Sequence, residues 1–227
     1  MLYLWPYILF FSWPLVLSSL LHGHIPLKFS ISSLSRKVFV LGTLTNLAAV
    51  IIHFNTIVHP FTLADNRHYM FYVFRILMRR EETKYLAAPV YVLCGYLVLQ
   101  ALGAKPGGMV VNKKGKAVGP APNSGCSTNF VLVWVITTAL SLVSAPLVEP
   151  RYCIIPWMMW RLRVPVAGSN ELTRTEEKGT REGRSDMYAT VLETLWFIVI
   201  AIGTGYMFLY RGFTWPQEPG KVQRFMW

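Results

Sequence analysis

The chain has 227 residues, of which 53% are hydrophobic and only 15% are charged. About a quarter of the residues of a soluble domain are usually charged, so this composition excludes a small soluble globule. It also excludes an intrinsically disordered chain, because such chains are poor in aromatic and branched apolar residues. The net charge of +11 is expected beside anionic lipid headgroups rather than on nucleic acid, because basic residues flank membrane spans. The composition therefore predicts an integral membrane protein.

Five segments are long and apolar enough to cross a bilayer, which takes about 20 residues. They are residues 2–21, 38–58, 85–103, 129–148 and 189–210. The first is interrupted by Pro6 and Pro14. We expect His53 to be buried and hydrogen-bonded to another helix, and Glu193 to reach the membrane interface. The pattern predicts an all-α, polytopic transmembrane helical protein with a single membrane domain over residues 1–227.

The connections between these segments are polar, and residues 104–128 and 163–188 are predicted to be flexible loops. If all five segments cross the membrane, the connections fall into two groups. One face carries residues 22–37, 104–128 and 211–227, and the other carries residues 59–84 and the start of 149–188. The numbers of Lys and Arg on the two faces are too similar to fix the orientation.

The densest polar cluster, residues 59–69, follows the second span directly and contains His59, Asp65, Asn66, Arg67 and His68. Arg67 offers planar donors for a phosphate, and His68 can donate a hydrogen bond or a proton. Asp65 can accept a proton from a hydroxyl group. The alternative interpretation is structural: Asp65 caps an amphipathic helix over residues 69–80, and Arg67 only extends to the membrane surface.

A second polar cluster ends the fourth span, where Glu149, Arg151 and Tyr152 surround a helix-terminating proline. Residues 152–160 are apolar but too few to cross the bilayer, so we predict a re-entrant or interfacial segment held by its tryptophans. Glu149 and Arg151 would then lie in a polar pocket at the membrane face. The alternative is an ordinary aromatic belt with one ion pair.

No metal site and no cofactor are expected from the sequence. Cys94, Cys126 and Cys153 lack the C-x-x-C spacing of zinc sites, and His22 and His24 lack a third ligand nearby. The Gly-rich stretch in residues 103–119 lacks the phosphate-binding pattern of nucleotide-binding loops. Nucleotides and nucleic acids are therefore not predicted as ligands.

Three stretches carry a resemblance to one enzyme family. The run His53-Phe-Asn-Thr-Ile-Val-His-Pro-Phe-Thr-Leu-Ala-Asp-Asn-Arg-His-Tyr69 resembles the signature of the endoplasmic-reticulum dolichyl-phosphate-glucose:Glc2Man9GlcNAc2-PP-dolichol α-1,2-glucosyltransferases. Leu147-Val-Glu-Pro-Arg-Tyr152 is similar to a second signature, and Gln223-Arg-Phe-Met-Trp227 to the C-terminal ending of the family.

The resemblance implies a multi-pass membrane enzyme of the endoplasmic reticulum, of the GT-C class. Such enzymes take glucose from a dolichyl-phosphate-glucose donor and add it, with inversion, to a dolichyl-diphosphate oligosaccharide acceptor in N-glycosylation. Family members are about twice as long, so this chain resembles their C-terminal half. The expected catalytic acid, in the first lumenal loop near the N-terminus, would then lie outside it. The alternative is a non-catalytic membrane interaction protein or channel regulator.

On this resemblance, the two polar clusters would serve the substrates. We expect the phosphate groups beside five residues, namely Asn66, Arg67, His68, Arg151 and Tyr152. Asp65 and Glu149 would orient these residues or contact sugar hydroxyls.

Overall fold

The computed structural model describes most of the chain, and its helices dominate. The described residues are 2–21, 31–56, 68–103, 109–111, 117–120, 126–145, 149–164, 179–214 and 220–224. The helices are α1 (Leu4–Leu21), α2 (Ile31–Asn55), α4 (Tyr69–Leu77), α5 (Glu81–Ala101), α6 (Thr128–Ser144), α7 (Arg151–Arg161) and α8 (Gly179–Tyr210). Two antiparallel pairs of short strands complete the fold, β1 (Met109–Val111) with β2 (Ala117–Pro120), and β3 (Phe213–Thr214) with β4 (Val222–Gln223). The predicted all-α architecture is confirmed.

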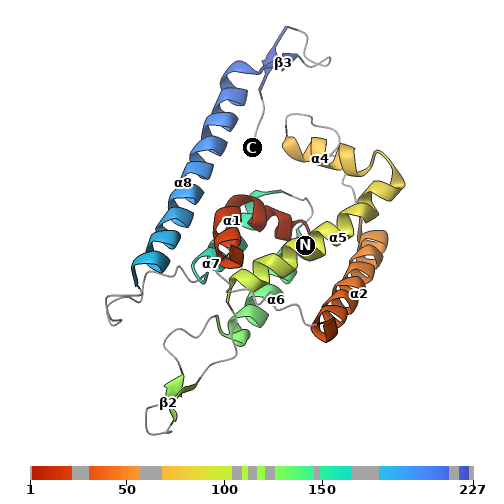
Figure 1. Cartoon of the computed structure of the whole chain (residues 1–227). Coiled ribbons are helices and arrows are strands. Elements are labelled where there is room, and N and C mark those ends of the chain that lie inside the picture. Colours follow the sequence, from red (N-terminus) through yellow and green to blue (C-terminus); the bar gives the residue numbers. More distant parts are fainter. Residues whose placement is uncertain are drawn as a thin grey trace.

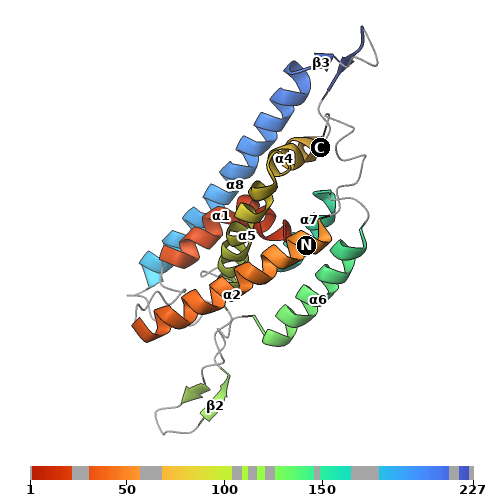
Figure 2. The same ribbon diagram turned by 90° about the vertical axis from the view of Figure 1, so that its right-hand side faces the viewer.

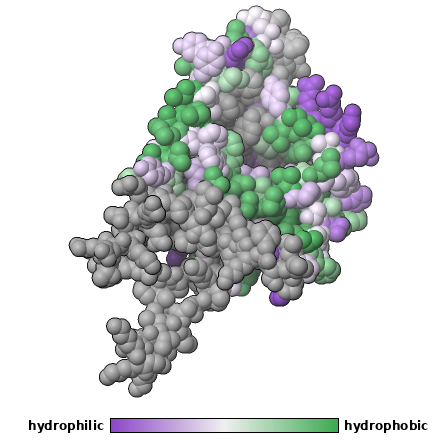
Figure 3. All heavy atoms as spheres, viewed as in Figure 1, coloured by the Kyte–Doolittle hydropathy of each residue, from purple (hydrophilic) through white to green (hydrophobic). Residues whose placement is uncertain are grey.

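Among the described residues, three helices are long and apolar enough to cross a membrane, over Ser35–Asn55, Glu81–Ala101 and Met187–Tyr210. Two further apolar helices, over Leu4–Leu17 and Thr128–Ser144, are shorter. Many large hydrophobic side chains of the described residues are exposed, and on the face shown in Figure 3 hydrophilic side chains gather at the corner where α4 joins α5. The chain is thus a multi-pass membrane protein, while the full set of five crossings stays a prediction.

Helix α1 lies at the centre of the bundle, in contact with α5, α7 and α8 (Figure 1). Its Leu4 and Ile8 are fully buried, in one cluster with Val98 of α5, Trp134 of α6 and Trp160 of α7. Lipid tails are as apolar as these side chains, so close packing rather than exclusion of water holds such a cluster together.

A kink in α1 explains one contact with α8. Ser12 has non-helical backbone angles (φ −125°, ψ 23°), and Pro14 follows inside the helix. Proline has no N–H, so the carbonyl of Phe10, four residues earlier, loses its helical partner. The indole N–H of Trp196 donates to that carbonyl at 2.8 Å. The kink thereby provides an acceptor that fixes α8 against α1.

Helices α6 and α7 form an antiparallel hairpin in which α7 runs back into the bundle. The Trp134 indole N–H donates to the Pro156 carbonyl at 3.1 Å, and the Arg163 guanidinium lies 4.8 Å from the Phe130 ring centroid. Residue numbers along α6 therefore decrease in the direction in which residue numbers along α7 increase, so the two helices are antiparallel. The segment 152–160 was predicted to be too short to cross the bilayer. It forms most of the 11-residue helix α7, which turns the chain back into the bundle.

A second tryptophan fixes α7 to the end of α5. The Trp160 indole N–H donates to the Val98 carbonyl at 3.0 Å, and Trp160 itself is fully buried. Val98 lies in the last turn of α5, where carbonyls lack helical partners. Trp157 donates to the Ser12 hydroxyl of α1 at 2.9 Å. The side chains of Trp157 and Trp160 therefore pack against other helices rather than form an aromatic belt at the membrane surface.

The C-terminal tail lies at the same end of the bundle as α4, opposite the β1–β2 hairpin (Figures 1 and 2). The prediction that residues 211–227 share a face with residues 104–128 is therefore wrong. The cause is α7, which brings the chain back before α8 begins. The Arg224 guanidinium donates to the Phe208 carbonyl of α8 at 3.2 Å, so the tail is tied to the helix that precedes it.

His53 links α2 to α5. Its Nδ1 lies 2.8 Å from the Tyr85 hydroxyl, which confirms the predicted hydrogen bond to another helix. The side chain is exposed, so the expectation of burial is wrong. His53 lies in the last turn of α2, and its exposed ring contacts α5 through Tyr85.

Candidate functional site

The first predicted cluster leads directly into α4. Asp65, Asn66 and Arg67 lie outside the described residues. His68 occupies the N-cap position of α4 with extended backbone angles, and its side chain makes no capping hydrogen bond. Because α4 begins at Tyr69 and His68 is its N-cap residue, the alternative interpretation that Asp65 caps this helix is wrong.

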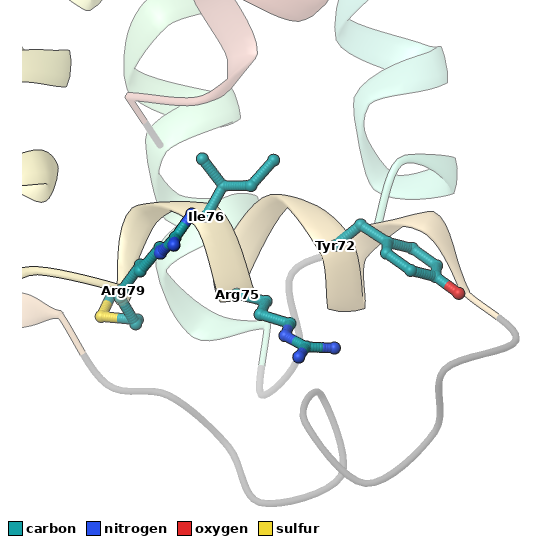
Figure 4. A pocket seen from close by; sticks show the side chains of 5 residues that line it. Tyr72, Arg75, Ile76 and Arg79 are labelled. Carbon is teal, nitrogen blue, oxygen red and sulfur yellow. The ribbon is translucent and has the colours of Figure 1, made fainter.

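A cavity of about 720 Å³ opens beside α4, lined by Tyr72, Arg75, Ile76, Met78 and Arg79 (Figure 4). Its size falls within the range of small-molecule sites. Both arginines are exposed, and the Arg75 guanidinium lies 5.9 Å from the Phe71 ring centroid. The cavity therefore combines cationic donors with apolar walls.

Arg75 and Arg79 were not among the predicted site residues, although the sequence carries a signal for them. The two arginines are four residues apart in an amphipathic run, which places them on one helical face. That spacing, directly after a polar cluster at a membrane boundary, is typical of an interfacial helix that meets anionic groups.

The second predicted cluster forms at the start of α7. Arg151 and Glu149 make an ion pair, and the Arg151 guanidinium lies 5.6 Å from the Tyr152 ring centroid. The hydrogen bond to Tyr152 and the adjacent Glu149 carboxylate raise the pKa of Arg151, so this side chain stays cationic. The Arg151 side chain is 70% exposed and thus open to an incoming anion.

The structure brings His68 of the first predicted cluster, and α4, which follows that cluster, to the same end of the bundle as the second cluster. Helix α4 and the junction of α6 with α7 both lie at the end opposite the β1–β2 hairpin (Figure 2). For the described residues 68–84 and 149–164, this arrangement agrees with the prediction that residues 59–84 and the start of 149–188 share a side; residues 59–67 lie outside the described residues. An anionic group at this end would meet Arg75 of α4, Arg79 just beyond the end of α4, and Arg151 of α7.

A buried ion pair joins α7 to α8, away from these clusters. Arg161 donates to both carboxylate oxygens of Glu193 at 2.9–3.2 Å, and the Glu193 side chain is only 7% exposed. Glu193 was expected to reach the membrane interface, and instead it points into the protein. The pair was missed because Arg161 and Glu193 are 32 residues apart in the sequence.

Within the described part of the chain, no group of three or more His, Cys, Asp or Glu is placed to hold a metal ion. The arginine-lined cavity instead suits an anion with an apolar attachment, because guanidinium groups bind phosphate through paired donors.

Residues 1–162 match the model of the DIE2/ALG10 family. The chain belongs to this family. The matched residues include both polar clusters, the helix α4 with its cavity, and the α6–α7 hairpin. No solved structure resembles the chain closely enough to match.

Curated relatives support the same assignment over the whole chain. The chain is 38% identical to a protein of Emericella nidulans, 36% identical to one of Aspergillus fumigatus and 39% identical to one of Pyricularia oryzae. All three are named Dol-P-Glc:Glc(2)Man(9)GlcNAc(2)-PP-Dol alpha-1,2-glucosyltransferase. Each comparison covers 100% of this chain but only 44–49% of the relative, so the chain spans about half the length of these proteins.

The comparison with the Emericella nidulans protein extends over 299 positions, more than the 227 residues of the chain. That relative therefore carries residues between the matched positions that this chain lacks.

Proposed function

We propose that the chain is the C-terminal membrane portion of a dolichyl-phosphate-glucose-dependent α-1,2-glucosyltransferase of the endoplasmic reticulum. The observation that carries this proposal is the identity of 36–39% over the full chain to proteins of that name. The substrates are a dolichyl-phosphate-glucose donor and the diglucosylated dolichyl-diphosphate oligosaccharide. The geometry supports this class of substrate, because cationic residues cluster at one end of an apolar helical bundle.

The proposed reaction is a single displacement with inversion. The acceptor hydroxyl oxygen attacks C1 of the donor glucose, and the bond between C1 and the phosphate oxygen breaks. The hydroxyl proton passes to a general base, and dolichyl phosphate leaves with one more negative charge than the phosphate carried in the donor. Cationic donors at the leaving group lower the barrier because they meet that charge as it develops.

Arg151 and Tyr152 would hold a substrate phosphate from the start of α7, and Asn66, Arg67 and His68 would do so from the segment before α4. Asp65 and Glu149 would orient these donors or contact sugar hydroxyls. The Glu149–Arg151 ion pair supports an orienting role for Glu149, because it fixes the guanidinium beside Tyr152.

Glucose transfer tests the proposal in microsomes that contain the complete gene product, donor and diglucosylated acceptor. Arg67→Ala and Arg151→Ala should each reduce transfer about tenfold or more, because a hydrogen bond between charged groups contributes about 1.5–3 kcal/mol. Arg36→Ala is the matched control, because Arg36 is an exposed arginine at the start of α2.

Protein levels must stay equal across the variants. Normal transfer by both Arg67→Ala and Arg151→Ala would remove these residues from the site. Absence of transfer by the unaltered protein would instead favour a non-catalytic membrane interaction protein or channel regulator.

A further inference from the structure

The cavity beside α4 is lined by residues of that helix and of the turn that follows it. Arg75 lies in α4, and Arg79 follows the end of this helix at Leu77; the guanidinium of Arg75 projects away from the helix (Figure 4). Ile76 is 65% exposed and lines the same cavity. A ligand there would meet two guanidinium groups together with apolar side chains.

The charge of the cavity is not neutralised by neighbours in the described part of the chain. Both ion pairs found there lie elsewhere, one between Glu149 and Arg151 and the other between Arg161 and Glu193. Glu81 and Glu82 follow in the first turn of α5, where carboxylates favour a helix N-terminus, and they do not line the cavity. Arg75 and Arg79 thus both line the cavity, and neither forms an ion pair with another described residue.

The location of the cavity favours a phosphate that is attached to lipid. Helix α4 immediately precedes α5, whose residues Glu81–Ala101 form a candidate membrane span. Figure 3 shows the hydrophilic surface at this corner next to apolar patches towards the centre of the view. A polyisoprenyl chain can lie along these apolar patches while its phosphate reaches the arginines.

We propose that Arg75 and Arg79 bind the phosphate of dolichyl-phosphate-glucose and of the dolichyl phosphate that remains after glucose transfer. The proposal rests on the glucosyltransferase function proposed above. The donor phosphate carries one negative charge and the departing phosphate gains a second as the C1–O bond breaks. Two arginines match the departing group better than the donor, so they favour transfer rather than donor binding alone.

Direct binding of dolichyl phosphate tests this site independently of activity. The complete gene product is placed in nanodiscs of neutral phospholipid, and its Kd for dolichyl phosphate is measured. Arg75→Gln combined with Arg79→Gln should raise that Kd about tenfold or more, because hydrogen bonds to a charged phosphate are lost. Arg75→Lys combined with Arg79→Lys should raise it less, since charge remains while the paired donors are lost.

Arg80→Gln is the matched control, because Arg80 is exposed and adjacent in sequence but does not line the cavity. It should leave the Kd unchanged. Equal Kd values for the Arg80 variant and the double Gln variant would overturn the proposal. A loss that appears only in nanodiscs with anionic phospholipid would also overturn it, because α4 would then contact general lipid headgroups.

Transfer kinetics separate this proposal from the proposed function. If the unaltered protein is active, the double Gln variant should have a higher KM for the donor than the unaltered protein. Its inhibition constant for dolichyl phosphate should rise by at least the same factor. The KM for the acceptor should stay the same. If the unaltered protein is inactive but binds dolichyl phosphate through Arg75 and Arg79, only the transferase function is refuted. If it is active and the double Gln variant has unchanged constants, only the phosphate site is refuted.

Discussion

At the scale of single residues, backbone carbonyls without helical partners decide which tryptophans hold the bundle. Pro14 removes a donor from α1, and Trp196 of α8 supplies one to Phe10. Trp160 likewise donates a hydrogen bond to the Val98 carbonyl at the end of α5. An unpaired carbonyl inside a bilayer costs several kcal/mol, so such contacts are strongly favoured there.

The proline and the tryptophan should therefore be coupled in a double-mutant cycle. Trp196→Phe alone should lower the free energy of unfolding by about 1–3 kcal/mol, because the Phe10 carbonyl is left without a donor. In a Pro14→Ala background the loss should be smaller, since the introduced alanine supplies a backbone N–H. Unfolding in detergent measures the stability loss in each background. An equal loss of unfolding free energy in the two backgrounds would show that the Phe10 carbonyl does not couple Pro14 to Trp196.

The two ion pairs should differ in their contribution to stability. Glu193→Gln should lower the free energy of unfolding by about 3–5 kcal/mol, because it leaves Arg161 partly buried without its carboxylate. Glu149→Gln should cost less than about 1 kcal/mol, because Arg151 is exposed to solvent. Replacing both Arg161→Met and Glu193→Leu should recover most of the loss, and failure to recover would indicate that the pair does more than satisfy charge.

At the scale of elements, α7 is the piece that organises the bundle. It is too short to cross the membrane, yet Cys153, Pro156 and Trp160 on one face are buried. Its contacts reach α1, α5, α6 and α8 through Trp157, Trp160, Pro156 and Arg161. Its first residue, Arg151, belongs to the proposed site, so the packing of α7 also positions that guanidinium.

Loosening α7 should expose Cys153, whose side chain is fully buried. Trp160→Phe keeps the aromatic packing and removes the hydrogen bond to Val98, so maleimide labelling of Cys153 in detergent should become faster. Cys126, which is half-buried at the start of α6, should label at an unchanged rate and serves as the internal control. Unchanged labelling of Cys153 would mean that packing alone holds α7.

At the scale of the whole molecule, the return of the chain through α7 sets the side on which the C-terminal tail lies. The β3–β4 hairpin and α4 share one end, and the β1–β2 hairpin occupies the other (Figures 1 and 2). The proposed phosphate site on α4 therefore lies on the same side as the tail.

Cysteine accessibility in sealed microsomes tests this arrangement. In a background without native cysteines, Arg80→Cys and Lys221→Cys should be labelled from the same side, and Ser127→Cys from the other. All three positions are exposed, so each can react once the reagent reaches its side. Labelling of Lys221→Cys together with Ser127→Cys would restore the simple alternation of five spans.

The sequence predicted the class of the protein because composition and span length reflect the solvent around it. Long apolar runs with polar ends have few solutions other than membrane helices. The two polar clusters followed from the same reasoning, since charged residues gather where the chain leaves the bilayer. Arg75 and Arg79 were also present in the pattern, but nothing along the chain shows a cavity, which depends on the neighbouring elements.

Sequence alone determined that this is a helical, multi-pass membrane protein of the DIE2/ALG10 family, with polar clusters before α4 and at the start of α7. Tertiary structure alone decided the pairing of Arg161 with Glu193, the tryptophan bonds that hold α7, and the side of the tail. The physical reason is range: hydropathy acts on each segment by itself, whereas a buried charge or carbonyl needs a partner that only the folded chain brings within about 3 Å.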